Sequence, residues 1–306
     1  MTENLRSEKG KGTMMQTIMK NWKIEAGTVE QIYGTAWNVD HKYILKKYDD
    51  QIKLDQSVLI METLKEQNVP VAGIIKTADG KKYSEIDSQF YLLTEKLEGS
   101  HPADIRATGL AYRIGEIIGQ LHLAFQKCEN DLQLRDNSML AEMKGWIQEE
   151  LEKDNWQLIM KDDYDKILAE LEEINPGLPR QPIHRDMHFG NFLFDEDRFT
   201  GYIDFDLSQK NIRIFDCCYF LAGQLTGEMG SQITDEEWLY AVNETLNGYG
   251  NVLPLVPGER RAAFLVMQGI ELLFAAFFLK IGNRKLAEEG AAVAKRIAKV
   301  AEWVLP

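Results

Sequence analysis

The spacing of hydrophobic and polar positions changes near residue 99, and this change divides the chain into two parts. Before it, runs rich in Val, Ile and Tyr predict strands, and residues 55–67, with apolar side chains at helical spacing, predict one helix. The expected strands are residues 29–40, 41–48, 71–75 and 90–97, and a turn centred on residues 38–41 joins the first two. These elements predict a small α+β lobe.

After Gly99 the pattern becomes helical. Residues 111–125 keep apolar side chains on one face, and the charged stretch 137–174 predicts two amphipathic helices with solvated faces. Helices resume at residue 215, and we expect breaks at Gly248–Gly250 and at the prolines after it. The predicted fold is α+β and two-lobed, with a flexible tail (1–20), a small β-rich N-lobe (21–99) and a larger, mainly helical C-lobe (100–306).

Composition and charge narrow the class of partner. The chain has 306 residues, 44% of them hydrophobic and 27% charged, which is typical of a soluble globular protein with room for two cores. The net charge of -13 argues against a nucleic-acid partner, because phosphate backbones are bound by concentrated Lys and Arg. The same charge suits a cationic small substrate.

The cysteines and the apolar runs indicate a compartment. Three cysteines, two of them adjacent at Cys217 and Cys218, cannot form a disulfide framework and fit a reducing environment. The first 20 residues contain no apolar core like that of a signal peptide, and the apolar run Leu272–Leu279 is far shorter than the ~20 residues that span a bilayer. We therefore expect a cytoplasmic protein with no membrane partner.

The stretch from Pro182 to Asp216 carries the candidate chemistry. Transfer of a phosphoryl group from ATP needs an oriented acceptor hydroxyl and a divalent cation that bridges the phosphates. Asp186 can accept the proton of the acceptor, and Asn191 and Asp204 offer the hard oxygen ligands that suit Mg²⁺. Residues 192–205 predict a β-hairpin with its turn around residues 195–201, which would fold Asp204 back beside Asn191.

This pattern, His184-x-Asp186-x4-Asn191 followed by Ile203-Asp204-Phe205-Asp206, resembles the signature of the aminoglycoside phosphotransferase and choline kinase superfamily, a branch of the protein-kinase-like fold. The resemblance implies that Asp186 is the catalytic base and that Asn191 and Asp204 hold Mg²⁺. It leaves His188 either as a donor to the γ-phosphate or as a residue that braces the loop, and it gives His184 and Arg185 a bracing role.

The same resemblance assigns nucleotide contacts in the N-lobe. Lys46 resembles the strand lysine that contacts the α- and β-phosphates, and Gly34-Thr35 would form the turn that covers them. In the segment that links the lobes, the Glu95 C=O and the Leu97 N–H would meet adenine. The family pairs the strand lysine with a helix glutamate, whose place in this chain is taken by Ser57, so the acidic partner of Lys46 is left open.

Three further residues have more than one interpretation. We expect His122 to pack in the core and Asp216 either to cap a helix or to brace the catalytic loop. Glu271, in an apolar helix, needs a partner: an arginine, a groove, or a cationic substrate.

The sequence therefore predicts an ATP- and Mg²⁺-dependent kinase of a small-molecule hydroxyl, with an aminoglycoside-, choline- or homoserine-like acceptor and an undetermined oligomeric state. The alternative is a non-catalytic nucleotide-binding or spore-coat-type protein on the same fold. A protein kinase is disfavoured, because no long activation loop ending in Ala-Pro-Glu follows Asp206.

Overall fold

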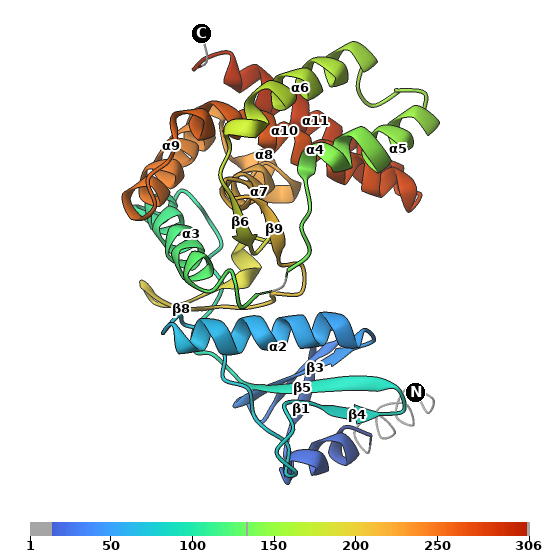
Figure 1. Ribbon diagram of the computed structural model, residues 1–306, viewed down its shortest axis with the longest axis vertical. Coiled ribbons are helices and arrows are strands. Elements are labelled where there is room, and N and C mark those ends of the chain that lie inside the picture. The colour runs from blue at the N-terminus through green and yellow to red at the C-terminus, as the bar shows by residue number, and fades with distance from the viewer. Residues whose placement is uncertain (1–13, 133, 305–306) are drawn as a thin grey trace. The chain divides into compact units, whose positions relative to one another are not determined.

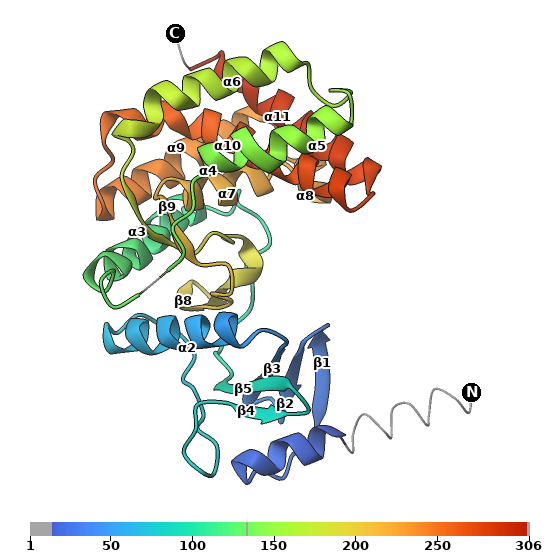
Figure 2. The ribbon, with the colours of Figure 1, turned by 45° about the vertical axis from the view of Figure 1, so that its right-hand side comes forward.

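The computed structural model describes residues 14–132 and 134–304 and divides into two compact units (Figures 1 and 2). Unit 1 comprises Met1–His101 together with Phe192–Asp206, and unit 2 comprises Pro102–Asn191 and Leu207–Pro306. The first division falls beside Gly99, where the sequence pattern changes. The hairpin after Asn191, which the sequence pattern places in the C-lobe, groups with unit 1.

Unit 1 is built on a five-stranded antiparallel sheet with the order β1-β2-β3-β5-β4. Its strands are β1 (Val29–Tyr33), β2 (Ala36–Val39), β3 (Tyr43–Tyr48), β4 (Ser84–Ile86) and β5 (Gln89–Glu95). Helix α2 (Gln51–Glu66) packs against β3 and β5 (Figures 1 and 2). It begins four residues before the predicted start, because the Asp50 side chain accepts hydrogen bonds from the Ile52 and Lys53 N–H groups.

The core of unit 1 begins earlier in the chain than expected. Residues 1–13 of the predicted tail lie outside the described residues, but Ile18 and Met19 are buried, and the short helix Lys20–Trp22 follows them. These side chains pack with Leu45 and Leu93 of the sheet, and Trp22 donates its indole N–H to the Ile75 carbonyl at 2.8 Å. The prediction of a flexible tail was therefore wrong for residues 14–20.

Two predicted strands differ from the structure. The stretch 29–40 is two strands, since the chain reverses at Gly34-Thr35 and pairs Tyr33 with Ala36. The stretch 71–75 is not a strand; it makes only isolated bridges, from Val71 to Tyr202 and from Ile74 to Thr94. The prediction rested on the apolar composition of this stretch. In the structure, the stretch pairs with each neighbouring strand at a single residue, which is too little to form a strand.

The hairpin of unit 1 has strands β7 (Phe192–Asp195) and β8 (Arg198–Tyr202), with a shorter turn than predicted. Its register pairs Phe192 with Tyr202. Ser100 and Phe194 exchange two backbone hydrogen bonds, of 2.8 and 2.9 Å. Gly99 has a φ of +103°, and a Cβ there would lie 2.3 Å from the Phe194 carbonyl oxygen. Glycine at this position therefore lets the end of the first segment approach the hairpin.

Unit 2 is mainly helical. Its longer helices are α3 (Leu110–Lys127), α6 (Lys161–Ile174), α7 (Phe215–Gly223), α9 (Asp235–Val252), α10 (Pro257–Lys280) and α11 (Arg284–Ala301). The shorter elements are α4 (Met139–Glu142), η2 (Met143–Ile147), α5 (Gln148–Lys153), η3 (Asn175–Gly177), η4 (Phe189–Asn191), α8 (Gly227–Gln232) and the strand pair β6 (Arg180–Ile183) and β9 (Gln209–Ile212).

Helices α3 and α9 cross at glycines (Figure 1). A Cβ on Gly248 would lie 1.9 Å from the Tyr112 carbonyl oxygen, and one on Gly115 would lie 2.0 Å from that of Thr245. The predicted break at Gly248–Gly250 was wrong, because α9 continues to Val252. Gly248 serves close helix packing at this position, and it does not end the helix.

By its length and composition, helix α10 could cross a membrane. We did not expect this from the sequence, because only the shorter apolar run Leu272–Leu279 within the helix was considered. However, 67% of the most apolar 18-residue stretch of this helix is buried inside the protein. It packs against α11, α7 and α6 of unit 2 (Figure 1). This burial identifies α10 as a core helix.

Candidate active site

A strained turn precedes Asp186 in unit 2. Arg185 has a φ of 71°, which is unfavourable for a residue with a side chain. The carboxylate of Asp216, in the first turn of α7, accepts the N–H groups of both His184 and Arg185 at 2.8 Å. The Arg185 guanidinium also pairs with Glu142 at 3.0 Å. Of its two predicted roles, Asp216 therefore has that of bracing the catalytic loop.

A buried hydrogen-bond chain extends this brace into the helices. His122 Nε2 lies 2.9 Å from Asp216 Oδ2, and His122 Nδ1 lies 2.9 Å from the Tyr249 hydroxyl. Because the carboxylate can only accept, we assign the histidine proton to Nε2, and Tyr249 then donates to Nδ1. All three side chains are fully buried. His122 is a core histidine as expected, and it links α3 and α9 to the loop.

Asp186 is held by two hydrogen-bond donors from the same unit. The Tyr219 hydroxyl donates to Oδ1 at 2.8 Å, and the Asn191 amide donates to the Asp186 carbonyl oxygen at 2.7 Å and to Oδ2 at 3.3 Å. Burial raises the pKa of Asp186, but its contacts with His188 and Tyr219 outweigh burial and lower the pKa to about 2. The carboxylate is therefore ionised at neutral pH and able to orient a hydroxyl group.

The His188 side chain braces the loop by accepting a backbone N–H group. Its Nδ1 accepts the Gly190 N–H at 3.0 Å, so Nε2 carries the proton of the neutral ring. Nε2 faces Asp186 Oδ2 at 3.6 Å, a contact longer than a hydrogen bond. The side chain is half exposed, and its Nε2 faces the Asp186 carboxylate.

Lys46 lies in a cluster of polar groups inside unit 1. Its ammonium contacts Asp204 Oδ1 at 2.8 Å and Asp206 Oδ2 at 2.7 Å. Asp206 Oδ1 accepts from Tyr48 at 3.1 Å and from Ser57 at 2.9 Å. Burial opposes the charge on Lys46, but attraction to Tyr48, Asp204 and Asp206 outweighs it and raises the pKa of the lysine. The acidic partners that the sequence leaves open thus come from the segment after the hairpin.

The proposed metal ligands have suitable chemistry. The Asn191 amide nitrogen is engaged by Asp186, which leaves its carbonyl oxygen to serve as a ligand. The Asp204 side chain is 44% exposed and offers a carboxylate. No group of three His, Cys, Asp or Glu side chains that could hold a metal occurs in the described ranges. This donor set fits Mg²⁺, which takes one or two protein oxygens and completes its shell with phosphate and water.

The other predicted nucleotide contacts also lie in unit 1. Gly34 and Thr35 form the exposed turn between β1 and β2, where a Cβ on Gly34 would meet no atom within 4 Å. Glu95 ends β5, and Leu97 follows it by two residues. The Thr35 carbonyl accepts the Lys47 N–H at 2.8 Å, which ties this turn to the strand that carries Lys46.

Glu271 is buried in α10 with 1% of its surface exposed. Burial and the nearby Glu289 raise its pKa to about 8. Within residues 14–132 and 134–304, Glu271 makes no ion pair, so the arginine partner, one of its three expected alternatives, is absent there. Tyr219 is also close enough for Glu271 to raise the pKa of its phenol. Glu271 is therefore a largely protonated carboxyl group near the residue that holds Asp186.

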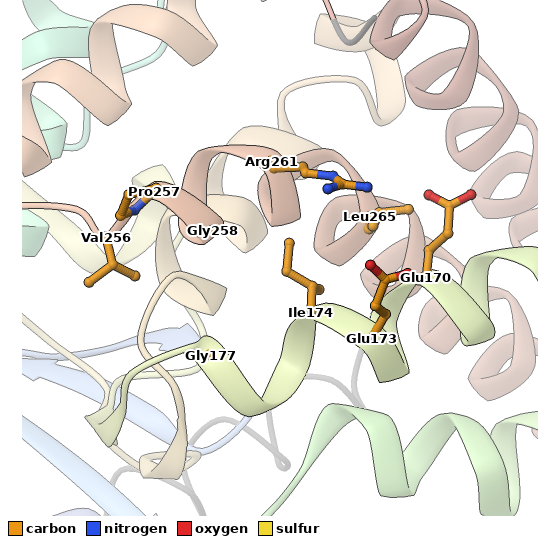
Figure 3. A pocket seen from close by; sticks show the side chains of 9 residues that line it. All are labelled: Glu170, Glu173, Ile174, Gly177, Val256, Pro257, Gly258, Arg261 and Leu265. Carbon is orange, nitrogen blue, oxygen red and sulfur yellow. The ribbon is translucent and has the colours of Figure 1, made fainter.

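A pocket of unit 2 lies away from this chemistry. It is lined by the end of α6 and the start of α10, including Glu170, Glu173 and Arg261 (Figure 3). The figure shows both glutamates on α6 and the arginine on α10. None of its lining residues belongs to the sequence motif.

Sequence reasoning missed Tyr219, Tyr48 and the partner role of Asp206. Tyr219 lies three residues after Asp216 on α7, so both side chains fall on the same helix face. That spacing is the one signal that could have placed it near the loop. Ser57 drew attention as a missing acid, although its hydroxyl is the group that reaches Asp206.

One family model matches most of the chain. The model of the phosphotransferase enzyme family (APH) matches residues 29–265. The homoserine kinase of Zymomonas mobilis subsp. mobilis is 26% identical over 245 residues, covering 76% of this chain and 72% of that protein.

Two solved structures share the fold. Amicoumacin kinase hAmiN, in complex with AMP-PNP, Ca²⁺ and Ami, has a TM-score of 0.68 at 16% identity, over 99% of this chain and 97% of that one. An aminoglycoside phosphotransferase from Alicyclobacillus acidocaldarius subsp. acidocaldarius has a TM-score of 0.70 at 16% identity, over 94% of each chain. These similarities confirm the predicted two-lobed fold class.

Proposed function

This chain belongs to the phosphotransferase enzyme family and is a small-molecule kinase, and on that premise we propose that it transfers the γ-phosphoryl group of ATP to a hydroxyl group in the cytoplasm. The observation that carries the proposal is the ionised carboxylate of Asp186, held by Tyr219 and Asn191. A fixed anion at this position orients the acceptor hydroxyl and receives its proton as the phosphorus–oxygen bond forms.

Asn191 and Asp204 would hold Mg²⁺, which would neutralise negative charge on the nucleotide phosphates. Lys46 would contact the α- and β-phosphates, and the Gly34-Thr35 turn would cover them. The Glu95 carbonyl and the Leu97 N–H would meet adenine, and the His188 Nε2–H would donate to the transferred group. The AMP-PNP and Ca²⁺ in the hAmiN structure support the use of a nucleotide and a divalent ion.

For the acceptor, we propose a small hydroxyl compound that carries an amino group. The relative from Zymomonas mobilis is a homoserine kinase, and a structural neighbour is an aminoglycoside phosphotransferase. Both acceptor classes bear ammonium groups, and the net charge of -13 favours cations over anions. Homoserine is the first candidate, because this relative matches over most of its length.

The test measures ATP turnover with homoserine, choline, ethanolamine and an aminoglycoside, for the wild type and for Asp186→Asn. We expect one acceptor to be phosphorylated and the substitution to lower kcat by at least roughly 10³-fold. Phosphorylation of none of them, with residual ATP hydrolysis equal in both proteins, would show that Asp186 performs no phosphoryl transfer to these classes.

A further inference from the structure

Three side chains, one of which is Lys46, donate to the carboxylate of Asp206. Asp206 Oδ2 accepts from the Lys46 ammonium at 2.7 Å, while its Oδ1 accepts from the hydroxyls of Ser57 and Tyr48. Ser57 is 2% exposed and Tyr48 is 8% exposed, so both donors are fixed by packing. The orientation of Asp206 is thus set independently of the lysine that it contacts.

The two acidic side chains of α2 nearest to Ser57 in sequence are engaged elsewhere. Glu62 pairs with Lys82 at 2.6 Å, and Asp55 accepts from the Tyr83 hydroxyl at 2.9 Å. Helix α2 contributes Ser57 to the Lys46 cluster, and Ser57 reaches the lysine by way of Asp206. The helix contributes a hydroxyl donor, and the carboxylate comes from the segment after the hairpin.

The two carboxylates at Lys46 differ in their surroundings. The Asp204 side chain is 44% exposed, whereas that of Asp206 is 26% exposed and is held by three donors. A divalent cation on Asp204 would compete with Lys46 for that carboxylate, because both are cations. Of the two carboxylates, Asp206 would then be the one that keeps the flexible lysine side chain in place.

We propose that Asp206 is a positioning residue that holds Lys46 toward the nucleotide phosphates, with Ser57 and Tyr48 fixing its carboxylate and Asp204 left to the metal. This inference rests on the proposed function and assigns different roles to the two carboxylates of the Asp204-Phe205-Asp206 segment. It assigns Ser57 as the link through which α2 controls nucleotide affinity.

The experiment measures the Kd of ATP by calorimetry without a divalent ion, and then the Mg²⁺ concentration for half-maximal activity. We expect Asp206→Asn to weaken ATP about tenfold, because Lys46 loses a charged partner, and to leave the Mg²⁺ requirement within twofold. Ser57→Ala should weaken ATP about threefold, while Ser84→Ala, a buried serine of unit 1 outside the cluster, should not change it.

The double variant Ser57→Glu/Asp206→Ser moves the carboxylate from the hairpin segment to α2. It should bind ATP at least threefold more tightly than Asp206→Ser alone, which a purely structural role would not produce. If Asp206→Asn does not fold, as judged by circular dichroism, Ser57→Ala and Tyr48→Phe carry the test, and unchanged ATP affinity in both overturns the inference.

A raised Mg²⁺ requirement with unchanged metal-free ATP affinity would make Asp206 a metal ligand and overturn the inference alone. A wild-type protein that binds no ATP would overturn the proposed function and this inference with it. The two failures are therefore distinguishable.

Discussion

Tyr219 donates its hydroxyl hydrogen to Oδ1 of Asp186 across 2.8 Å. The tyrosine is carried by α7, whose first turn also contains Asp216, the carboxylate that holds the backbone of the loop. One helix therefore fixes both the side chain of the candidate catalytic residue and the main chain directly before it. Burial and the Asp186 charge raise the pKa of Tyr219, so it remains a donor at all physiological pH values.

Replacing Tyr219 by Phe should lower kcat by roughly tenfold or more, because a hydrogen bond to a charged group contributes about 1.5–3 kcal/mol. The KM for ATP should stay within twofold. The pKa of Asp186 should rise from about 2 toward its ordinary value of 3.8, measurable by carbon NMR titration. Tyr240→Phe is the matched control, since Tyr240 is 66% exposed. Equal kcat in wild type and Tyr219→Phe would contradict this role.

Replacing Asp216 by Asn should weaken the hydrogen bonds that hold the backbone of the loop before Asp186. An amide can accept only through its oxygen, so one of the donors that now share the carboxylate would be left facing an NH₂ group. A buried unsatisfied donor costs about 1–3 kcal/mol, and the turn at Arg185 would relax. We expect kcat to fall by roughly 10- to 100-fold in steady-state assays.

The affinity of Asp216→Asn for ATP provides the control, because the proposed nucleotide contacts Lys46, Gly34 and Thr35 belong to unit 1. It should remain within twofold of the wild-type value. A loss of ATP affinity equal to the loss of kcat would show general unfolding in place of a loop defect.

The raised pKa of Glu271 predicts a pH-dependent stability. The folded carboxyl has a pKa of about 8 and the unfolded one about 4.5, so the free energy of unfolding should fall as pH rises from about 4.5 to about 8. Glu271→Gln removes this slope and should stabilise the protein at pH 8 by up to roughly 4 kcal/mol, at 1.36 kcal/mol per pKa unit. Urea unfolding at pH 5, 6.5 and 8 measures it.

Glu149→Gln, at an exposed position, is the control for Glu271→Gln and should show no such trend. A difference between Glu271→Gln and wild type that stays constant from pH 5 to pH 8 would mean that Glu271 titrates normally. Glu289 and Tyr219 are the titratable groups near Glu271 in the structure, so Glu289→Gln should lower the pKa of Glu271.

Two glycines of α9 predict opposite effects of the same substitution. Gly248→Ala places a Cβ 1.9 Å from the Tyr112 carbonyl oxygen, and it should destabilise the protein by about 1–3 kcal/mol or more. Gly250→Ala meets no atom closer than 3.9 Å and should stabilise the helix by about 0.5–1 kcal/mol. Denaturant midpoints measure both, and an equal shift for the two variants would refute the close crossing.

Local pattern was enough to predict most of the fold. Helical spacing located α2 and α3, and the alternation of β-rich and helical stretches gave the two-lobed class, because these signals depend on residues near one another in the chain. Gly248 was misread as a break, since close packing against a helix far away in sequence uses the same residue type as a helix end. The buried residues before Trp22 were missed because charged neighbours hid their contact with the sheet.

In the candidate site, too, contacts between residues close in sequence could be predicted, and contacts between distant residues could not. Asp186 and Asn191 stand in one short motif, and their hydrogen bond follows from that proximity. Lys46 and Asp206 are 160 positions apart, and no local pattern pairs them. Tyr219 and Tyr48 lie in ordinary apolar elements, where a tyrosine is most simply a core residue, so their functional contacts become visible only with the tertiary structure.

The glycine crossing of α3 and α9 has a consequence for how this protein can change over generations. Tyr249 follows Gly248 directly, and its hydroxyl begins the chain that runs through His122 to Asp216 and the catalytic loop. A methyl group at the crossing would separate the helices and disturb the hydrogen bond between Tyr249 and His122. Selection on phosphoryl transfer therefore extends to a residue with no side chain, and natural variation at Gly248 should be as restricted as at a catalytic position.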